Sequence, residues 1–227
     1  MQQQTAVIIG ASGLIGSNLL QQLLKDNDFS NVTILVRNKL PFEHLKLRQV
    51  IINFNHEDEY RQMGIGDIIF CCIGTTQKKV KGNKKEYEKI DVEIPVTAAE
   101  TGSKQGFKKF LIVSSVGADV NSSNFYLHIK GKMENAIRQT LFSSISIFRP
   151  SMLLGQRSES RPLERVGQTI MKSFSFIFIN KIKKYHPIQA DQVAGAMIVV
   201  SKENTTGITV FEYNEMMSLI NKDQHQQ

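Results

Sequence analysis

A glycine-rich stretch near the start of the chain, GASGLIGS at residues 10–17, constrains the fold more than any other feature of the sequence. It follows the apolar run AVII (6–9) and precedes a stretch in which leucine and isoleucine recur at helical spacing. Glycines at this junction allow a sharp turn and close packing of a helix on a strand. The pattern therefore predicts a βα unit with a tight, open turn.

Short apolar runs alternate with helix-like stretches along the rest of the chain. The expected strands are 7–9, 32–36, 50–54, 68–73, 110–113, 145–148 and 208–213, and the expected helices are 14–24, 87–102, 127–140 and 190–201. This alternation predicts an α/β fold with a doubly wound parallel sheet. The length of 227 residues suits one domain over 1–227, with a core at 5–155 and a small substrate-facing part at 156–227.

Composition narrows the classes of function without selecting one. The net charge of +7 and the pI near 9.4 indicate an anionic partner, such as a nucleotide, a nucleic acid or a membrane surface. The first residues lack the basic and apolar regions of a signal peptide, and no stretch approaches the roughly 20 apolar residues that span a bilayer. We therefore expect a cytoplasmic protein with no membrane span.

Neither the cysteines nor the histidines indicate a metal site. Cys71 and Cys72 are adjacent on an expected strand, where they are predicted to be buried apolar residues. The five histidines show no ligand spacing with each other or with cysteine. We expect no metal ion, and a homodimer is one option for the oligomeric state.

The glycine turn is predicted to bind a dinucleotide. Gly10 permits the turn, Gly13 lets a phosphate approach the backbone, and Gly16 lets the helix pack on the strand. The second strand ends in Arg37, where an NAD-binding fold usually carries an acid. A guanidinium there suits a 2′-phosphate, which predicts NADP(H) rather than NAD(H). A ligand-free glycine turn and a solvated arginine are the alternatives.

Three further segments predict a reactive centre near this turn. Gly74 follows the fourth expected strand and lets a dinucleotide pass close to the backbone, and Ser114 and Ser115 end the fifth. Tyr126 and Lys130, four residues apart, share one face of the next helix. A free phenol has a pKa of about 10, and a neighbouring ammonium favours its ionised form. A surface pair is the alternative for these two residues.

In this order, GxxGxxG, the serine pair and YxxxK resemble the short-chain dehydrogenase/reductase superfamily in its extended and atypical branch. The stretches FCCIGTT, SSVGAD, SSNFYLHIKGKME and FRPSMLLGQRSESRP resemble, more closely, the Tat-interacting-protein group of NADPH-binding oxidoreductases. The likeness covers about residues 5 to 165, with a weaker tail.

The resemblance implies a Rossmann-type fold, NADP(H) as cofactor and a set of site residues. With those inferred above, the cofactor-binding residues are Gly10, Ser12, Gly13, Leu14, Ile15, Gly16, Arg37, Asn38, Ile73, Gly74, Tyr126, Lys130, Leu153 and Arg161. Tyr126 would donate or accept the proton and Lys130 would bind the nicotinamide ribose. Ser115 would polarise a substrate carbonyl, with Ser114 as the alternative.

These features predict an NADPH-dependent oxidoreductase that transfers hydride to a small carbonyl-like substrate, and a non-catalytic NADPH sensor that reports to a partner is the alternative.

A lysine-rich segment, residues 78–85, follows the fourth expected strand. A solvated loop, attraction of an anionic substrate and contact with nucleic acid would all explain it. The lack of interleaved stacking aromatics weakens the nucleic-acid interpretation.

Overall fold

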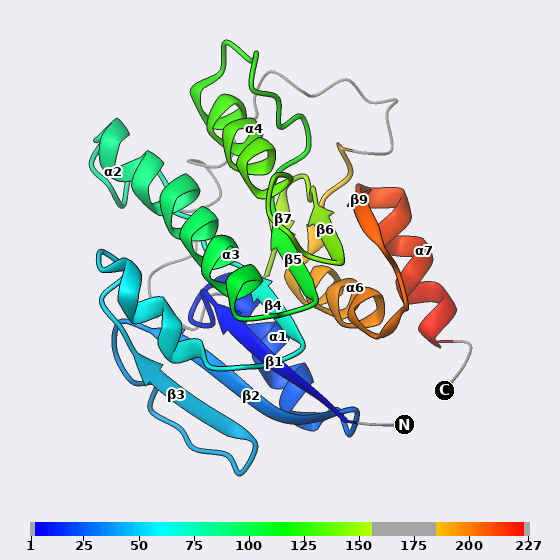
Figure 1. Cartoon of the computed structure of the whole chain (residues 1–227). Coiled ribbons are helices and arrows are strands. Elements are labelled where there is room, and N and C mark those ends of the chain that lie inside the picture. Colours follow the sequence, from blue (N-terminus) through cyan, green and yellow to red (C-terminus); the bar gives the residue numbers. More distant parts are fainter. Residues whose placement is uncertain (1–2, 156–184, 225–227) are drawn as a thin grey trace.

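The computed structural model describes residues 3–155 and 185–224. Seven strands form one sheet in the order β3-β2-β1-β4-β5-β6-β9, and every neighbouring pair is parallel (Figure 1). Their bounds are Gln4–Ile9 (β1), Phe29–Val36 (β2), Leu47–Ile51 (β3), Ile68–Cys71 (β4), Lys109–Val113 (β5), Ser144–Phe148 (β6) and Gly207–Phe211 (β9). The expected doubly wound α/β fold is confirmed. The strand order reverses between β1 and β4, where such sheets form a crevice.

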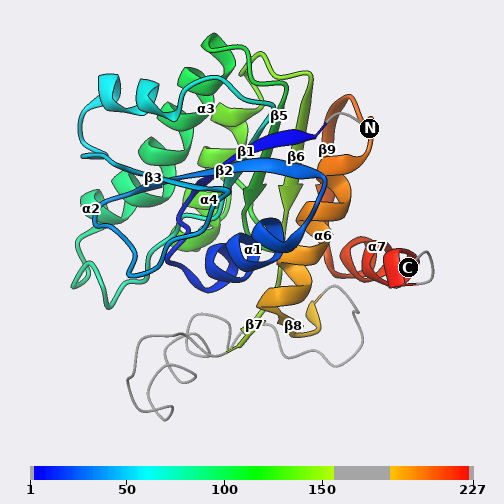
Figure 2. The same ribbon diagram turned by 90° about the horizontal axis from the view of Figure 1, so that it is seen from below.

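Helices cover both faces of this sheet (Figure 2). One face carries α1 (Leu14–Lys25), α6 (Ala190–Lys202) and α7 (Tyr213–Gln224). The other carries a 3-10 turn (η1, Glu57–Met63), α2 (Lys84–Glu88), a π-helical turn (η2, Lys89–Glu93), α3 (Ile94–Lys104) and α4 (Phe125–Ile137). Ala6 and Ile8 of β1 join the first layer, while Val7 and Ile9 join the second. Burial on both sides explains why the strand is apolar throughout.

Several elements differ from the sequence-based expectation. Strand β3 begins three residues before the expected 50–54, because it lies at the sheet edge and its burial is not continuous. The expected helix 87–102 contains the π turn η2, which hydrophobic spacing does not reveal. Helix α7 was not expected because its sequence is largely polar, although Met216 is buried.

The chain after residue 184 completes the same layers. Helix α6 packs on α1, and β9 adds the seventh strand beside β6. A two-stranded sheet joins β7 (Leu153–Leu154) to β8 (Ile188–Gln189). Within the described residues, none of the helices has the length and apolar character needed to cross a bilayer. A substrate-facing role for residues 156–227 stays a prediction.

Close backbone contacts fix the turn after β1. Gly10 has a φ of +89°, and a Cβ there would lie 2.7 Å from the carbonyl carbon of Cys72 at the end of β4. A Cβ on Gly16 would lie 2.2 Å from the carbonyl oxygen of Gly10. The turn, the start of α1 and the end of β4 therefore pack at distances that only glycine permits.

We expect Gly10→Ala to reduce the free energy of unfolding much more than Gly82→Ala does. Gly82 also has a positive φ, +78°, but no atom within 4 Å of its would-be Cβ, so alanine there costs only about 1–2 kcal/mol of backbone strain. At Gly10 the overlap with β4 adds ~1–3 kcal/mol. Urea unfolding followed by circular dichroism measures both, and equal losses would contradict the close packing.

Candidate functional site

The segments that follow β1, β4 and β5 come together at the carboxyl edge of the sheet. They carry the glycine turn, Gly74 and the serine pair respectively. The β1 and β4 strands are direct neighbours, and β5 lies beside β4. This edge is where ligands bind in open α/β folds, so the candidate site is built here.

The glycine turn leads directly into the first turn of α1. The amide of Gly13 donates to the carbonyl of Gly10 at 2.9 Å, and the amide of Ser17 donates to that of Gly13 at 2.9 Å. As at any helix start, the amides of Leu14 and Ile15 have no intrahelical acceptor. With the positive end of the helix dipole they can bind an anion. Ser12 is exposed beside them.

The other residues assigned to the cofactor lie around this turn. Arg37 and Asn38 are exposed directly after β2, and Arg37 forms no ion pair with the described residues. Leu153 lies in β7, and a Cβ on the nearby Gly155 would lie 3.3 Å from Leu14 Cδ1. Ile73 lies directly after β4 and is partly buried. Arg161 lies outside the described residues.

A buried ion pair lies beside Gly74. Lys130 Nζ of α4 is 2.9 Å from Asp91 Oδ1 of η2, with side-chain exposures of 5% and 1%. The amide of Thr75 donates to Asp91 Oδ2 at 2.8 Å. A Cβ on Gly74 would lie 3.5 Å from Asp91 Oδ1 and 3.9 Å from Lys130 Nζ. Because Gly74 is itself exposed, the pair lies close beneath the protein surface.

Charge interactions keep Lys130 protonated. Burial alone would lower the pKa of its ammonium, but the attraction of Asp91 and of Tyr126 outweighs burial and raises the pKa above its usual range. Tyr126 precedes Lys130 by four residues on α4, which is the spacing of a shared helix face, and it interacts electrostatically with the ammonium. The arrangement therefore joins a half-buried tyrosine to a permanently charged lysine.

Local structure sets the position of each partner. The π turn η2 carries Asp91 between α2 and α3, and such turns are frequent at functional sites. The side chain of Asn124 caps α4 by accepting from the amides of Tyr126 and Leu127 at 3.0 and 3.2 Å. A Cβ on Gly131 would lie 2.2 Å from the amide nitrogen of Val120. The loop before α4 therefore packs tightly against the turn that carries Lys130.

The two serines have different partners. The Ser114 hydroxyl donates to Glu134 Oε1 at 2.6 Å, and Arg149 Nε donates to the same oxygen at 2.9 Å. The Ser115 hydroxyl donates to the carbonyl of Val116 at 3.3 Å, a longer contact. Ser114 thus belongs to a buried charged network, whereas Ser115 is less tightly held.

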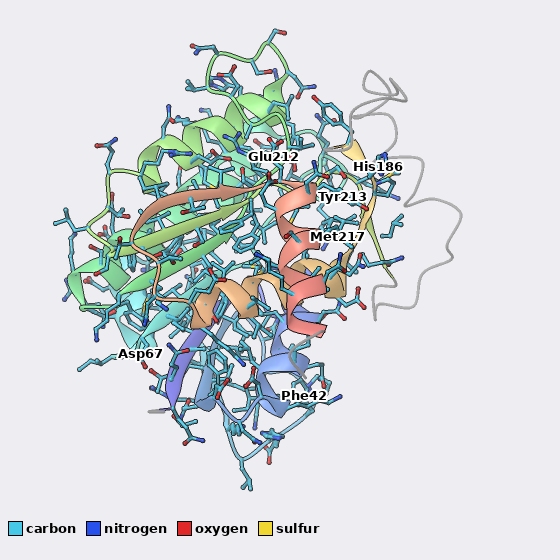
Figure 3. The ribbon with its side chains drawn as sticks, turned by 90° about the vertical axis from the view of Figure 1, so that its right-hand side faces the viewer. Phe42, Asp67, His186, Glu212, Tyr213 and Met217 are labelled. Carbon is cyan, nitrogen blue, oxygen red and sulfur yellow. The ribbon has the colours of Figure 1, made fainter. Side chains whose placement is uncertain are left out.

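Sequence reasoning missed Asp91, Thr75, Glu134 and Arg149. Asp91 lies far from Lys130 in the sequence, and no short motif links them. The described residues hold no group of three side chains fit to bind a metal ion. His186 contacts the ring of Tyr213 edge-on at 5.4 Å, at the start of α7 (Figure 3). This ring contact gives His186 a structural role at the start of α7, and we assign it no role in the chemistry.

We expect Asp91→Asn to reduce the free energy of unfolding by about 3–5 kcal/mol near pH 7, because Lys130 would stay buried without its counter-charge. In the wild type the raised pKa of Lys130 means that its stabilising effect is fully present below pH 10.5 and is lost as the pH rises through the folded pKa. In the variant, burial lowers that pKa, so stability should rise with pH toward 10.5. Urea unfolding across pH 6–10 should therefore show this rise in the variant, and no dependence on pH from Lys130 in the wild type.

The matched control is Glu88→Gln, which removes the partner of the half-exposed Lys132 of α4; Glu88 ends α2, directly before η2. It should cost less than about 1 kcal/mol and show no such dependence on pH. Equal losses in the two variants would show that the Asp91 pair has no special role in stability.

Three comparisons relate the chain to known proteins. The HIM1 family model matches residues 45–186, more than half of the chain. The protein HTATIP2 of Rattus norvegicus is 39% identical over 177 residues, which cover 76% of this chain and 72% of that protein. The protein FMP52, mitochondrial, of Meyerozyma guilliermondii is 31% identical over 205 residues, which cover 87% of this chain and 85% of that protein.

Solved structures share the fold at low sequence identity. MoeE5 in complex with UDP-glucose and NAD is similar with a TM-score of 0.66 at 16% identity, covering 97% of this chain and 82% of that one. A short-chain dehydrogenase/reductase from Veillonella parvula has a TM-score of 0.62 at 14% identity, covering 90% of this chain and 89% of that one. These structures support the Rossmann-type fold.

The cytoplasmic location expected from the sequence is wrong. Six curated relatives whose matches cover 87% to 97% of this chain are all named FMP52, mitochondrial. The expectation depended on the absence of a recognisable targeting segment, and such an absence does not exclude an organelle.

The family match, the two curated relatives and the fold agree with the resemblance seen in the motifs. The glycine turn follows β1, the serine pair follows β5, and the YxxxK motif lies in α4. The chain belongs to the HIM1 family, and it is a homologue of HTATIP2 with a Rossmann-type fold.

Proposed function

We propose that this protein is an NADPH-dependent oxidoreductase that reduces a small carbonyl-like substrate with Tyr126 as proton donor. The observation that carries the proposal is the Lys130 ammonium, held charged by buried Asp91 and interacting with Tyr126. It lies at the sheet edge that also carries the glycine turn. A structural neighbour, MoeE5, was solved with NAD, which supports a nicotinamide cofactor here.

The residues present fit a phosphorylated dinucleotide. The backbone of the Gly10 turn and the first turn of α1 would hold the pyrophosphate, since a Cβ on Gly10 or Gly16 would close the turn. Arg37 is exposed and forms no ion pair with the described residues. It would hold the 2′-phosphate of NADPH at the position where NAD-binding folds carry an acid that binds the ribose hydroxyl. Lys130 would hold the nicotinamide ribose.

Each of the chain's reactive residues has a distinct part. When bound, the cofactor supplies a hydride. The Lys130 ammonium interacts with the Tyr126 phenol and would stabilise the negative charge that develops on its oxygen as the proton leaves. Tyr126 gives its proton to the substrate oxygen, and the hydroxyl of Ser115 donates to that oxygen as charge develops there. Ser114, which already donates to Glu134, would support this edge of the site.

We expect NADPH to bind more tightly than NADH, and Arg37→Ala to remove most of the difference. Loss of a charge-assisted contact to phosphate should weaken NADPH binding by about 10- to 100-fold and leave NADH binding nearly unchanged. Titration of cofactor fluorescence measures all four dissociation constants. Lys39→Ala, which removes an exposed lysine two residues away, is the control. Tighter binding of NADH to the wild type would contradict the assignment.

We expect Tyr126→Phe to lower kcat by about 10²- to 10⁴-fold while NADPH still binds, since only the proton donor is lost. Ser115→Ala should lower kcat about 10²- to 10³-fold. Ser114→Ala should mainly reduce stability, because it breaks the contact to Glu134. NADPH oxidation with a panel of aldehydes, ketones and quinones measures the rates. NADPH binding without oxidation of any panel member would favour a cofactor sensor.

A further inference from the structure

The lysine-rich segment, residues 78–85, concentrates positive charge between β4 and α2. Its five lysines are Lys78, Lys79, Lys81, Lys84 and Lys85, and the segment contains no acidic residue. All five are exposed, and within the described residues none of them forms an ion pair. Lys132 on the neighbouring helix is instead paired with Glu88. The charge of the segment is therefore available to a ligand.

The segment is an ordered loop. Val80 is 8% exposed and packs into the core, and the amide of Gly82 donates to the carbonyl of Gln77 at 2.9 Å. The side chain of Asn83 accepts from the amide of Glu86 at 3.1 Å and so caps α2. Lys81 has a φ of +50°, a conformation that lysine rarely adopts. The fold thus holds these lysines on a defined scaffold.

Contacts tie this loop to the candidate reactive centre. The hydroxyl of Tyr87 donates to the carbonyl of Thr75, whose amide donates to Asp91. Lys84 Nζ lies 5.2 Å from the ring centroid of Phe125, the residue directly before Tyr126. Figure 1 shows α2 beyond the carboxyl edge of the sheet, where it begins the long helical segment that continues through η2 into α3. The positive loop thus borders the side of the site that carries Tyr126.

Neighbouring charges leave the loop as the main source of positive charge on this side. Asp91 neutralises Lys130, and Glu134 neutralises Arg149. Arg37 follows β2, which is separated from β4 by β1. Two strand spacings are about 10 Å, so the 2′-phosphate expected at Arg37 and an anion at the loop would occupy different positions.

We propose that the lysine-rich segment binds an anionic group, a carboxylate or a phosphate, on the substrate whose carbonyl is reduced at Tyr126, an inference that rests on the proposed function. Ammonium groups are flexible point charges that pair with both anions. A positive rim also attracts anionic substrates and speeds their binding. Nucleic acid fits less well, because Tyr87, the aromatic residue next to the segment, is 4% exposed and cannot stack on a base.

The test compares pairs of aldehydes in which one member carries an anionic group and the other is neutral. Dissociation constants are measured by saturation-transfer NMR on the NADPH-loaded protein for 4-carboxybenzaldehyde and its neutral methyl ester, and for glyceraldehyde 3-phosphate and glyceraldehyde. We expect one anionic member to bind at least about tenfold more tightly than its neutral partner, and less tightly as salt is added. The pair that shows the preference distinguishes carboxylate from phosphate. No preference in either pair would overturn the inference.

The variant Lys78→Gln/Lys79→Gln/Lys81→Gln should remove this preference, weakening the anionic ligand about tenfold or more and leaving the neutral ligand unchanged. It leaves Lys84 in contact with Phe125. The control Lys25→Gln/Lys104→Gln/Lys108→Gln removes equal charge from exposed lysines at the opposite edge of the sheet and should change neither ligand. Equal weakening in the two variants would assign the effect to net charge and overturn the inference.

Two further readouts separate this inference from its rivals and from the proposed function. If the loop variant weakens NADPH itself, or if a 20-nucleotide single strand binds through the loop while the aldehydes do not, the anionic-substrate inference is wrong. Loop-dependent binding of the anionic aldehyde supports the anion site. If NADPH oxidation is then absent with every aldehyde, the proposed function fails while the anion site remains.

Discussion

Asp91 and Lys130 meet at 2.9 Å in a region almost closed to solvent, and the geometry of the candidate site depends on this contact. Burying two charges costs several kcal/mol for each ion, and the pair is tolerated only where the contact is close and other donors complete it. The amide of Thr75 supplies such a donor to Asp91. One ion pair thus joins the end of β4, the π turn η2 and helix α4, and it fixes the helix face that also carries Tyr126.

A second charged network performs the same structural task one strand further along. Glu134 of α4 accepts from Ser114 after β5 and from Arg149 after β6. The hydrogen bond to Glu134 raises the pKa of the Arg149 guanidinium, which therefore stays charged throughout the physiological range. The face of α4 that meets the sheet edge is therefore held at two positions one turn apart, at Lys130 by Asp91 and at Glu134 by Ser114 and Arg149. This arrangement uses the Ser114 hydroxyl, whereas the Ser115 hydroxyl donates only to the carbonyl of Val116 at 3.3 Å.

Local chemistry made much of the fold and part of the site predictable. The turn at Gly10 and the helix face shared by Tyr126 and Lys130 depend on neighbouring residues, so spacing alone locates them. Asp91 could not be found in this way, because its link to Lys130 is made by tertiary packing and by a π turn. The polar sequence of α7 hid a helix whose buried Met216 packs against the first layer.

The groups along the carboxyl edge of the sheet differ in charge from one strand end to the next. The Gly10 turn offers uncharged amides, and Arg37 after β2 is cationic. The ion pair of Asp91 with Lys130 is neutral overall, whereas the lysine-rich segment is positive. The Debye length is about 8 Å at physiological salt, comparable with the spacing from β2 to β4. A phosphate at Arg37 and an anion at the lysine-rich segment would therefore interact weakly. Because the pair is neutral, two anionic groups bound at the proposed positions would not compete for the same cation.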